Sequence, residues 1–337
     1  MSKDIRLLAD DERGAAKALW KEAFNDSDAF IDWYFANKIL PGNSLCMFEG
    51  GQLISIVHMI PYTISVQGRP LSSAFIAGVA TAKNRRGEGL MRTMLLESLA
   101  LLKTRGILMT HLYPFSHAFY EAFGWAAYSY VNRLEVNSVP HRCGAEIIET
   151  MDKDVLAPLY NRMMRGFDGY VIRGEREWDW RLGELGSDGG QCAVLLKNGS
   201  AQSYMLFYGI KDKAEIIEAV YADEEDIGAL LAYVLSLGYS SVQYHIPARE
   251  GVSAVKHGMA RVVDAQALLR AFDALPLLNQ FDIEDGFAEW NSVSNGNSRK
   301  ITIDELALLV HCGASRLNAE KMGRFFVPRR TCIFEAY

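Results

Sequence analysis

The strongest constraint on the fold of this chain lies in residues 74–102, where an apolar segment, a glycine-containing loop and an amphipathic segment follow one another. The apolar segment ends near Thr81 and is typical of a buried strand. Gly87 and Gly89 let the loop backbone approach a ligand without a Cβ atom, and the free N–H groups at a helix start favour an anion. Helical spacing then relates Met91, Met94, Leu95, Ser98, Leu99 and Leu102. We therefore expect a strand, a phosphate-binding loop and a helix.

Basic side chains surround the two glycines, namely Lys83, Arg85, Arg86 and Arg92. They favour a pyrophosphate or phosphate as the ligand. Residues 87–92 also partly match the GxGxxG fingerprint of dinucleotide-binding folds, but that loop follows the first strand of a βαβ unit. Residues 43–80 here show several strands joined by short turns, so a dinucleotide site is the weaker alternative.

The composition is that of a globular protein with more than one core. The chain has 337 residues, of which 50% are hydrophobic, so two or three domains are expected. Its net charge of −6 does not support nucleic-acid binding and mildly favours a cationic substrate. The five cysteines lack zinc-site spacing, and neither a signal sequence nor a membrane-spanning run is visible. We expect a cytoplasmic protein that binds no metal and no membrane.

The loop sequence Arg86-Gly-Glu-Gly89-Leu-Met91 resembles the coenzyme A loop of the GNAT acetyltransferases. That pattern is Arg or Gln, two residues, Gly, one residue, then Gly or Ala, and only the last position departs here. A bulkier residue at this position resembles the enhanced-intracellular-survival (Eis) branch of the family. The resemblance implies acetyl-CoA as co-substrate, and it implies coenzyme contacts from Val79, Ala80, Thr81, Arg86, Gly87, Glu88, Gly89, Leu90 and Met91.

Strand signals flank this loop on both sides. Turn residues before it separate strand-like segments, which predict an antiparallel meander, at 45–48, 53–60, 62–66 and 71–80. Residues 107–113 are predicted to form a short buried strand. In a GNAT fold the strands ending here at Thr81 and Tyr113 run parallel and separate at their ends. The resemblance implies that the acyl-pantetheine arm binds in that gap as an added strand would.

Residues 116–125 contain a second motif, which resembles the family's Phe-Tyr-x-x-x-Gly-Phe segment. The family's tyrosine protonates the departing thiolate, so the resemblance implies that Tyr120 is the general acid. The alternative is that Tyr120 is one more core aromatic beside Phe119 and Trp125. His117 is the one histidine close to this motif and is a possible spare base.

An acidic and aromatic segment, residues 25–35, occupies the place where a GNAT domain has its acceptor-side helix. Asp26, Phe30 and Trp33 could form a pocket for an amine. The alternative is a solvated, capped helix with one aromatic face.

The expected fold class is α+β, with tandem GNAT folds followed by a short sterol-carrier-protein-like α/β domain. Residues 1–140 are expected to form the catalytic GNAT domain. Residues 141–260 repeat an α+β pattern without an Arg-x-x-Gly-x-Gly loop, and they resemble the degenerate second GNAT domain of Eis proteins. Residues 261–337 resemble a shortened sterol-carrier-protein domain, for which a structural role is expected instead of lipid transport.

The C-terminal residues 325–337 are apolar and aromatic to the last position, which predicts a segment docked inside the protein. In Eis-type enzymes the chain ends in an aromatic residue whose main-chain carboxylate takes the proton from the attacking amine. The resemblance assigns this role to Tyr337. The alternatives are a tail packed for stability alone, or Glu335 or His117 as the base.

These observations predict an acetyl-CoA-dependent N-acetyltransferase that acts directly on a primary amine of a cationic small molecule or a lysine side chain. The resemblance also implies a homo-oligomer, a hexamer built from trimers. The alternative from another class is a non-catalytic acyl-CoA-binding regulator or scaffold, which would keep the loop at Arg86 and need neither Tyr120 nor a base.

Overall fold

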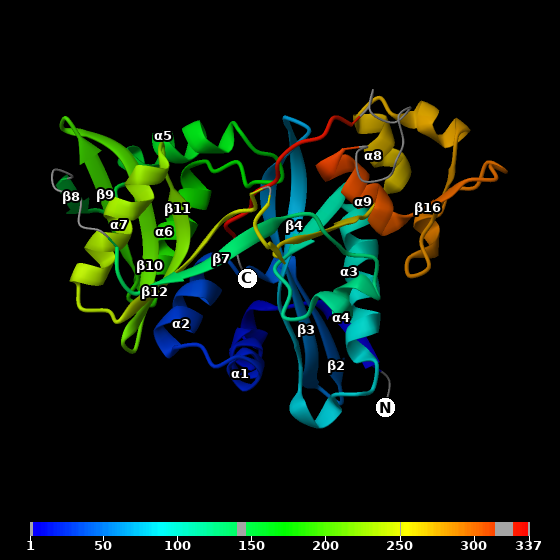
Figure 1. Cartoon of the computed structure of the whole chain (residues 1–337). Coiled ribbons are helices and arrows are strands. Elements are labelled where there is room, and N and C mark those ends of the chain that lie inside the picture. The colour runs from blue at the N-terminus through cyan, green and yellow to red at the C-terminus, as the bar shows by residue number, and fades with distance from the viewer. Residues whose placement is uncertain (1–2, 140–145, 250, 314–325, 336–337) are drawn as a thin grey trace.

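The computed structural model describes residues 3–139, 146–249, 251–313 and 326–335 (Figure 1). Their strands form two seven-stranded sheets and one two-stranded sheet. No helix in these ranges is both long enough and apolar enough to cross a membrane. Tyr337 lies outside the described residues.

The first sheet carries the predicted loop. In sheet order its strands are β1 (Lys3–Leu7), β2 (Ser44–Glu49), β3 (Gln52–Val66), β4 (Arg69–Thr81), β5 (Met109–Leu112), β14 (Met259–Val262) and β6 (Ala126–Ala127). The predicted meander is present as β2, β3 and β4, which pair antiparallel. The separate strands expected at 53–60 and 62–66 are one strand, β3. Pro61 lies after His58, the last residue of β3 that pairs with β2, and before Thr63, whose carbonyl accepts from the Ile172 N–H. At Pro61 itself the paired neighbour is β4 alone, and a proline is tolerated.

Helices cover both faces of this sheet, because side chains of β4 alternate between two cores. Ala74 and Ile76 face the core that contains α3 (Leu90–Thr104), which forms as predicted. Phe75 and Ala77 face the other core. That second core is shared by α1 (Arg13–Ala23), α2 (Asp28–Asn37), α8 (Ala265–Ala271) and α9 (Ile303–Cys312).

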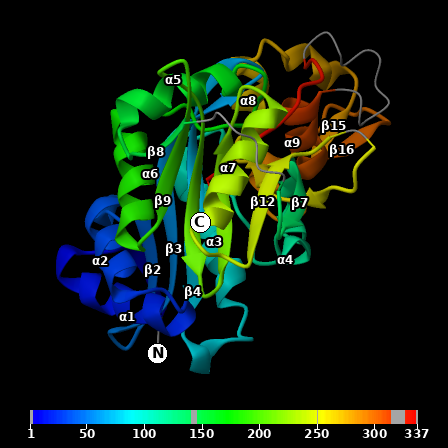
Figure 2. The ribbon, with the colours of Figure 1, turned by 60° about the vertical axis from the view of Figure 1, so that its left-hand side comes forward.

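The second sheet lies beside the first in Figure 1 and comes forward, in front of it, in Figure 2. Its order is β13 (Val255–Lys256), β7 (Tyr130–Val136), β12 (Ser241–Pro247), β11 (Lys213–Val220), β10 (Ser200–Ile210), β9 (Gln191–Lys197) and β8 (Glu146–Glu149). Helices α5 (Lys153–Met164) and α6 (Glu175–Ser187) pack on one face, and α7 (Glu224–Ser236) packs on the other.

One strand returns from the second sheet to the first. The second unit begins with β7, which pairs with β12, and its sheet takes the consecutive strands β7 to β13. β14 follows that unit and returns to the first sheet, where it pairs with both β5 and β6. No single cut in the chain therefore separates the two sheets, and their relative position is set by backbone pairing.

The third segment, which runs from α8 to α9, packs on the first sheet. Its strands β15 (Asp282–Glu284) and β16 (Lys300–Thr302) pair parallel, and α8 and α9 lie beside them. Leu268 and Leu306 belong to the same buried cluster as Phe75 and Ala77 of the first sheet. The segment therefore shares its core with the first sheet.

Four buried histidines predict acid-sensitive stability. Burial lowers the pKa of His58 and His311 to about 3 and that of His257 to about 4, and it also lowers the pKa of His111. An unfolded histidine titrates near ~6.5, so below that pH the unfolded chain binds more protons than the folded chain. Stability should therefore fall as the pH drops from about 6.5 towards 3, by about 1.4 kcal/mol per pH unit for each such histidine.

Urea unfolding measured from about pH 7.5 down to about pH 5 checks this dependence. The unfolding midpoint should fall with pH, and His311→Gln should show a shallower slope because that site no longer titrates. A midpoint independent of pH would contradict the prediction.

Candidate active site

The loop between β4 and α3 has the backbone geometry of an anion cradle. Gly87 and Gly89 have φ values of 83° and 73°, in the left-handed region that favours glycine. Gly89 is the N-cap of α3. A Cβ built at either glycine would meet no other atom within 4 Å, so the space before the helix is open. The free N–H groups of the first turn of α3 can therefore bind an anionic group.

The two arginines of the loop, Arg85 and Arg86, differ in whether their charge is already paired with a carboxylate. Arg85 binds Glu49 at 2.5 Å and Glu88 at 2.7 Å, and these contacts lower the pKa of both carboxyl groups. Arg86 donates from Nε to the Thr81 carbonyl at 3.2 Å, which ties the loop to the end of β4. Arg85 thus neutralises the one acid in the loop, and the exposed guanidinium of Arg86 remains close to the cradle.

β4, which precedes the loop, and β5, which follows α3, separate at their ends, as the resemblance implied. β4 and β5 pair parallel only from Ser73 with Met109 to Phe75 with His111. From Ile76 to Thr81, β4 pairs with β3 and has no strand partner on the β5 side within the described ranges. The backbone of Val79, Ala80 and Thr81 therefore lies along an unpaired edge, to which an extended arm can add.

A bulge shapes this edge. The register between β3 and β4 shifts at Gly78, whose φ is 52°. A Cβ at Gly78 would overlap the rings of Trp20 and His58. The position thus requires glycine, and the bulge turns the backbone of the next residues relative to the strand.

Tyr120 lies on α4 (His117–Glu121), on the same side of the first sheet as α3. Its side chain is only 4% exposed, and its ring lies 5.1 Å from that of Phe119 and 5.9 Å from that of Trp125. Burial raises the pKa of its hydroxyl, so the group is protonated at neutral pH. No hydrogen bond joins the hydroxyl to another residue in the described part of the chain, which leaves its proton available to a ligand.

The three side chains expected to bind an amine are engaged in packing. Asp26 accepts a hydrogen bond from the Trp20 indole at 2.7 Å. Phe30 is buried, and Trp33 packs so closely on α6 that a Cβ at Gly183 would overlap its ring. None of the three lines the cavity described next.

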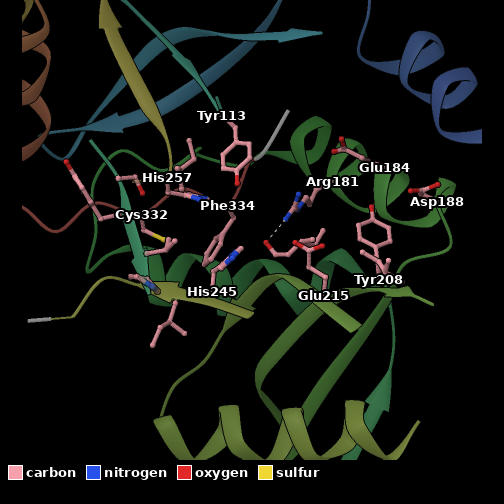
Figure 3. A pocket seen from close by; sticks show the side chains of 18 of the residues that line it. Tyr113, Arg181, Glu184, Asp188, Tyr208, Glu215, His245, His257, Cys332 and Phe334 are labelled. Atoms are coloured by element: carbon pink, nitrogen blue, oxygen red, sulfur yellow. Dashed lines mark hydrogen bonds between the residues drawn. The ribbon is translucent and has the colours of Figure 1, made fainter. Parts of the chain in front are cut away.

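A cavity of about 340 Å³ lies between the two sheets (Figure 3). Tyr113, the first residue after β5, lines it, so the cavity reaches the end of β5 where the strands have parted. Residues 332–334 of the C-terminal tail form part of the wall. The polar side chains around it are Arg181, Glu184, Asp188, Tyr208, Glu215, His245 and His257. The sequence did not single out these residues as a site, because they lie on or next to the second sheet and its helix α6, far from the loop in sequence.

Buried ion pairs lie next to the cavity, and two of their members, Arg181 and Glu184, line it. Arg173 binds Glu218 at 2.7 Å and Glu335 at 2.8 Å, and Arg181 binds the same Glu218 at 3.0 Å. Lys38, the C-cap of α2, binds Glu184 of α6 at 2.5 Å. The charges in this network are balanced, because Lys38, Arg173 and Arg181 face Glu184, Glu218 and Glu335. Two further acids on the cavity wall, Asp188 and Glu215, have no cation partner among the described residues and favour a cationic ligand.

Two histidines that line the cavity, His245 and His257, have lowered pKa values, which favours the neutral ring. His245 accepts a hydrogen bond from Nε of Arg133 at 3.0 Å, and burial together with that guanidinium lowers its pKa. His257 contacts the backbone of Ile333. Nε2 of His117 donates to the His257 carbonyl at 3.1 Å.

The C-terminal tail is held at the cavity by backbone hydrogen bonds. Asp168 donates its N–H to the Arg330 carbonyl at 2.7 Å and accepts from the Cys332 N–H at 3.0 Å. Glu335, a possible base, is instead bound by Arg173. The tail is therefore fixed up to two residues before Tyr337.

Residues 4–128 match the family model of the acetyltransferase (GNAT) domain. The glycine loop, the parted strands and Tyr120 all lie within this range. The chain therefore carries a GNAT acetyltransferase domain, and the prediction of a GNAT-type N-acetyltransferase is confirmed at this level.

The whole chain is similar in fold to several solved structures. A probable N-acyltransferase from Enterococcus faecalis V583 aligns with a TM-score of 0.79 at 20% sequence identity, with 100% of each chain covered. A GCN5-related N-acetyltransferase from Anabaena variabilis gives a TM-score of 0.76 at 15% identity, also with 100% of each chain covered. Eis1 from Mycobacterium abscessus gives 0.69 at 14%, again over 100% of each chain. At these identities the likeness shows a shared fold. A search of curated protein sequences finds no significant match.

Proposed function

We propose that this chain is an acetyl-CoA-dependent N-acetyltransferase that transfers an acetyl group directly to a primary amine of a cationic small molecule or a lysine side chain. The observation that carries the proposal is the position of the cavity. Tyr113 lines it at the end of β5, where β4 and β5 have parted, so an amine in the cavity can approach a thioester held along the edge of β4.

Each part of the site has a role in this proposal. The cradle at Gly87, Glu88, Gly89, Leu90 and Met91, with Arg86, holds the diphosphate, and the edge at Val79, Ala80 and Thr81 holds the pantetheine arm. The coenzyme supplies the acetyl group as a thioester. Backbone N–H groups of that edge polarise the carbonyl. The amine nitrogen bonds to the acetyl carbon as the carbon–sulfur bond breaks, and Tyr120 gives its proton to the leaving thiolate.

Release of free thiol from acetyl-CoA tests the proposal, with polyamines, aminoglycosides and lysine peptides as acceptors. At least one primary amine should stimulate release in proportion to the acetylated product. Coenzyme binding without turnover on any amine would overturn it and favour the regulator or scaffold.

We place the acceptor in the cavity, with Glu215 as a contact for a second cationic group of the acceptor. Glu215→Gln should raise KM for a diamine about 3- to 10-fold, the effect of a half-buried ion pair worth about 1 kcal/mol, with little change in kcat. Glu146→Gln, an exposed acid on β8 at the far edge of the second sheet, is the matched control. An unchanged KM for Glu215→Gln would show that this wall does not bind the acceptor.

We propose the main-chain carboxylate of Tyr337 as the group that takes the amine proton. The tail is fixed at the cavity up to Glu335, which supports this placement. A short Gly-Ser extension after Tyr337 should lower kcat at least about 10-fold, whereas Tyr337→Phe should retain activity because it keeps the carboxylate. Normal turnover of the extended enzyme would exclude the terminal carboxylate and leave His117 as the candidate.

The resemblance also supports two broader proposals. Residues 261–337 would be a shortened sterol-carrier-protein-like domain whose role is structural, since its core is continuous with that of the first sheet. The protein would assemble as a homohexamer.

A further inference from the structure

A fully buried arginine lies next to the helix that carries Tyr120. Arg261 is on β14, the strand that returns to the first sheet after the second unit, and its side chain is 0% exposed. Its Nη2 binds Oδ2 of Asp285 at 2.7 Å. Asp285 accepts further hydrogen bonds through Oδ1 from the backbone N–H groups of Phe287 and Ala288 at 3.1 and 3.0 Å. The carboxylate is thereby fixed, and it fixes the guanidinium.

The guanidinium packs on the turn that ends α4. Its central carbon lies 5.4 Å from the centroid of the Trp125 ring and 5.7 Å from that of Phe287. Gly124 lies beside it with a φ of 80°, and a Cβ there would overlap Nη1 of Arg261. Only a glycine with this left-handed backbone leaves room for the guanidinium.

Trp125 connects this contact to Tyr120. The N–H of Trp125 donates to the Tyr120 carbonyl at 3.2 Å, which closes the end of α4, and the two rings lie 5.9 Å apart. We propose that Arg261, held by Asp285, is a positioning residue that acts through Trp125 to hold the Tyr120 hydroxyl in place for proton transfer. The inference rests on the proposed function of Tyr120 as the general acid.

The energetics favour this explanation over a purely structural one. Within the described residues, Nε and Nη1 of Arg261 and Nε1 of Trp125 are buried without a hydrogen-bond partner. Unpaired buried donors destabilise a protein, and well-packed apolar side chains often replace a buried ion pair at no cost in stability. Stability alone therefore does not require a charged side chain here. A positioning role explains the charged side chain, because the guanidinium of Arg261 is rigid and planar and contacts the turn at the end of α4.

A double-mutant cycle tests the inference. Arg261→Met should lower kcat about 10- to 100-fold in the wild-type background, because a small displacement of a catalytic group is costly. It should change kcat less than about 2-fold in the Tyr120→Phe background, where no proton donor remains to be positioned. The Kd for coenzyme A should stay unchanged in both. Arg261→Lys, which keeps the charge but not the plane, provides the same cycle if Arg261→Met does not fold.

Leu277→Ala is the control for loss of stability, since it opens a cavity in the third segment and Leu277 belongs to a different buried cluster from Tyr120. It should lower Tm without lowering kcat. If Arg261→Met lowers kcat equally in both backgrounds, and Tyr120→Phe by itself lowers kcat as expected, the inference about Arg261 is overturned and the role of Tyr120 stands. Equal kcat for the wild type and Tyr120→Phe would overturn the role of Tyr120 and the inference with it.

Discussion

Gly89→Asp will abolish coenzyme binding, with Kd raised more than about 100-fold. Gly89 caps α3 with a φ of 73°, and the space in front of it is open. A side chain would enter the space proposed for the diphosphate, and a carboxylate there would repel it at the site where the helix favours an anion. Isothermal titration calorimetry with coenzyme A measures the loss, and wild-type affinity would overturn the assignment of the loop.

Two controls separate charge from backbone strain. Gly89→Ala keeps the left-handed strain, which costs about 1–2 kcal/mol, and lacks the charge, so its effect should be smaller. Gly106→Asp introduces the same residue at a φ of 71° with the same open space, at the other end of α3, and should bind coenzyme normally. Arg86→Ala should weaken binding modestly and mainly at low salt, because its exposed charge is screened.

Tyr120→Phe will lower kcat by about 10²-fold or more, the usual contribution of a general acid, and leave the Kd for coenzyme A unchanged. The substitution keeps the ring, which packs on Phe119 and Trp125, and removes only the hydroxyl. Because burial raises the pKa of that hydroxyl, the wild-type enzyme should keep its acid protonated through neutral and mildly alkaline pH. The measurement is steady-state thiol release with both substrates saturating.

Tyr233→Phe is the matched control for loss of a phenol. Tyr233 lies on α7 of the second unit, and its hydrogen bond to Glu149 raises its pKa to about 12. It lines no part of the described cavity, so kcat should be unchanged. If Tyr120→Phe behaves like this control, Tyr120 is a core aromatic and another group protonates the thiolate.

Part of the candidate site could be predicted because its signals are local in sequence. The loop at residues 82–89 and helix α3 follow from glycine geometry and apolar spacing within about 20 consecutive residues. The short motif around Tyr120 also formed the expected helix, with Ser116 as its N-cap. Adjacent residues determine such features, so they are readable before any tertiary contact is known.

The cavity proposed for the acceptor could not be predicted in this way. Asp26, Phe30 and Trp33 have chemistry that suits an amine, but Asp26 is bound by Trp20, Phe30 is buried, and Trp33 packs on α6. The acids that line the cavity, Asp188 and Glu215, belong to a different sheet and helix more than 150 residues further along the chain. An isolated carboxylate in the sequence does not reveal which cavity it will face.

By itself the sequence determined the coenzyme loop, the helix behind it and the strands that lead to it, because backbone conformation there depends on neighbouring residues. Only the tertiary structure decided that β7 joins the second sheet and β14 returns to the first, that a cavity opens where β5 ends, and that Arg261 packs on Trp125 beside Tyr120. These features depend on pairing between segments more than 100 residues apart, and many alternative pairings satisfy the same pattern of apolar residues. The folded packing of both units selects one of them.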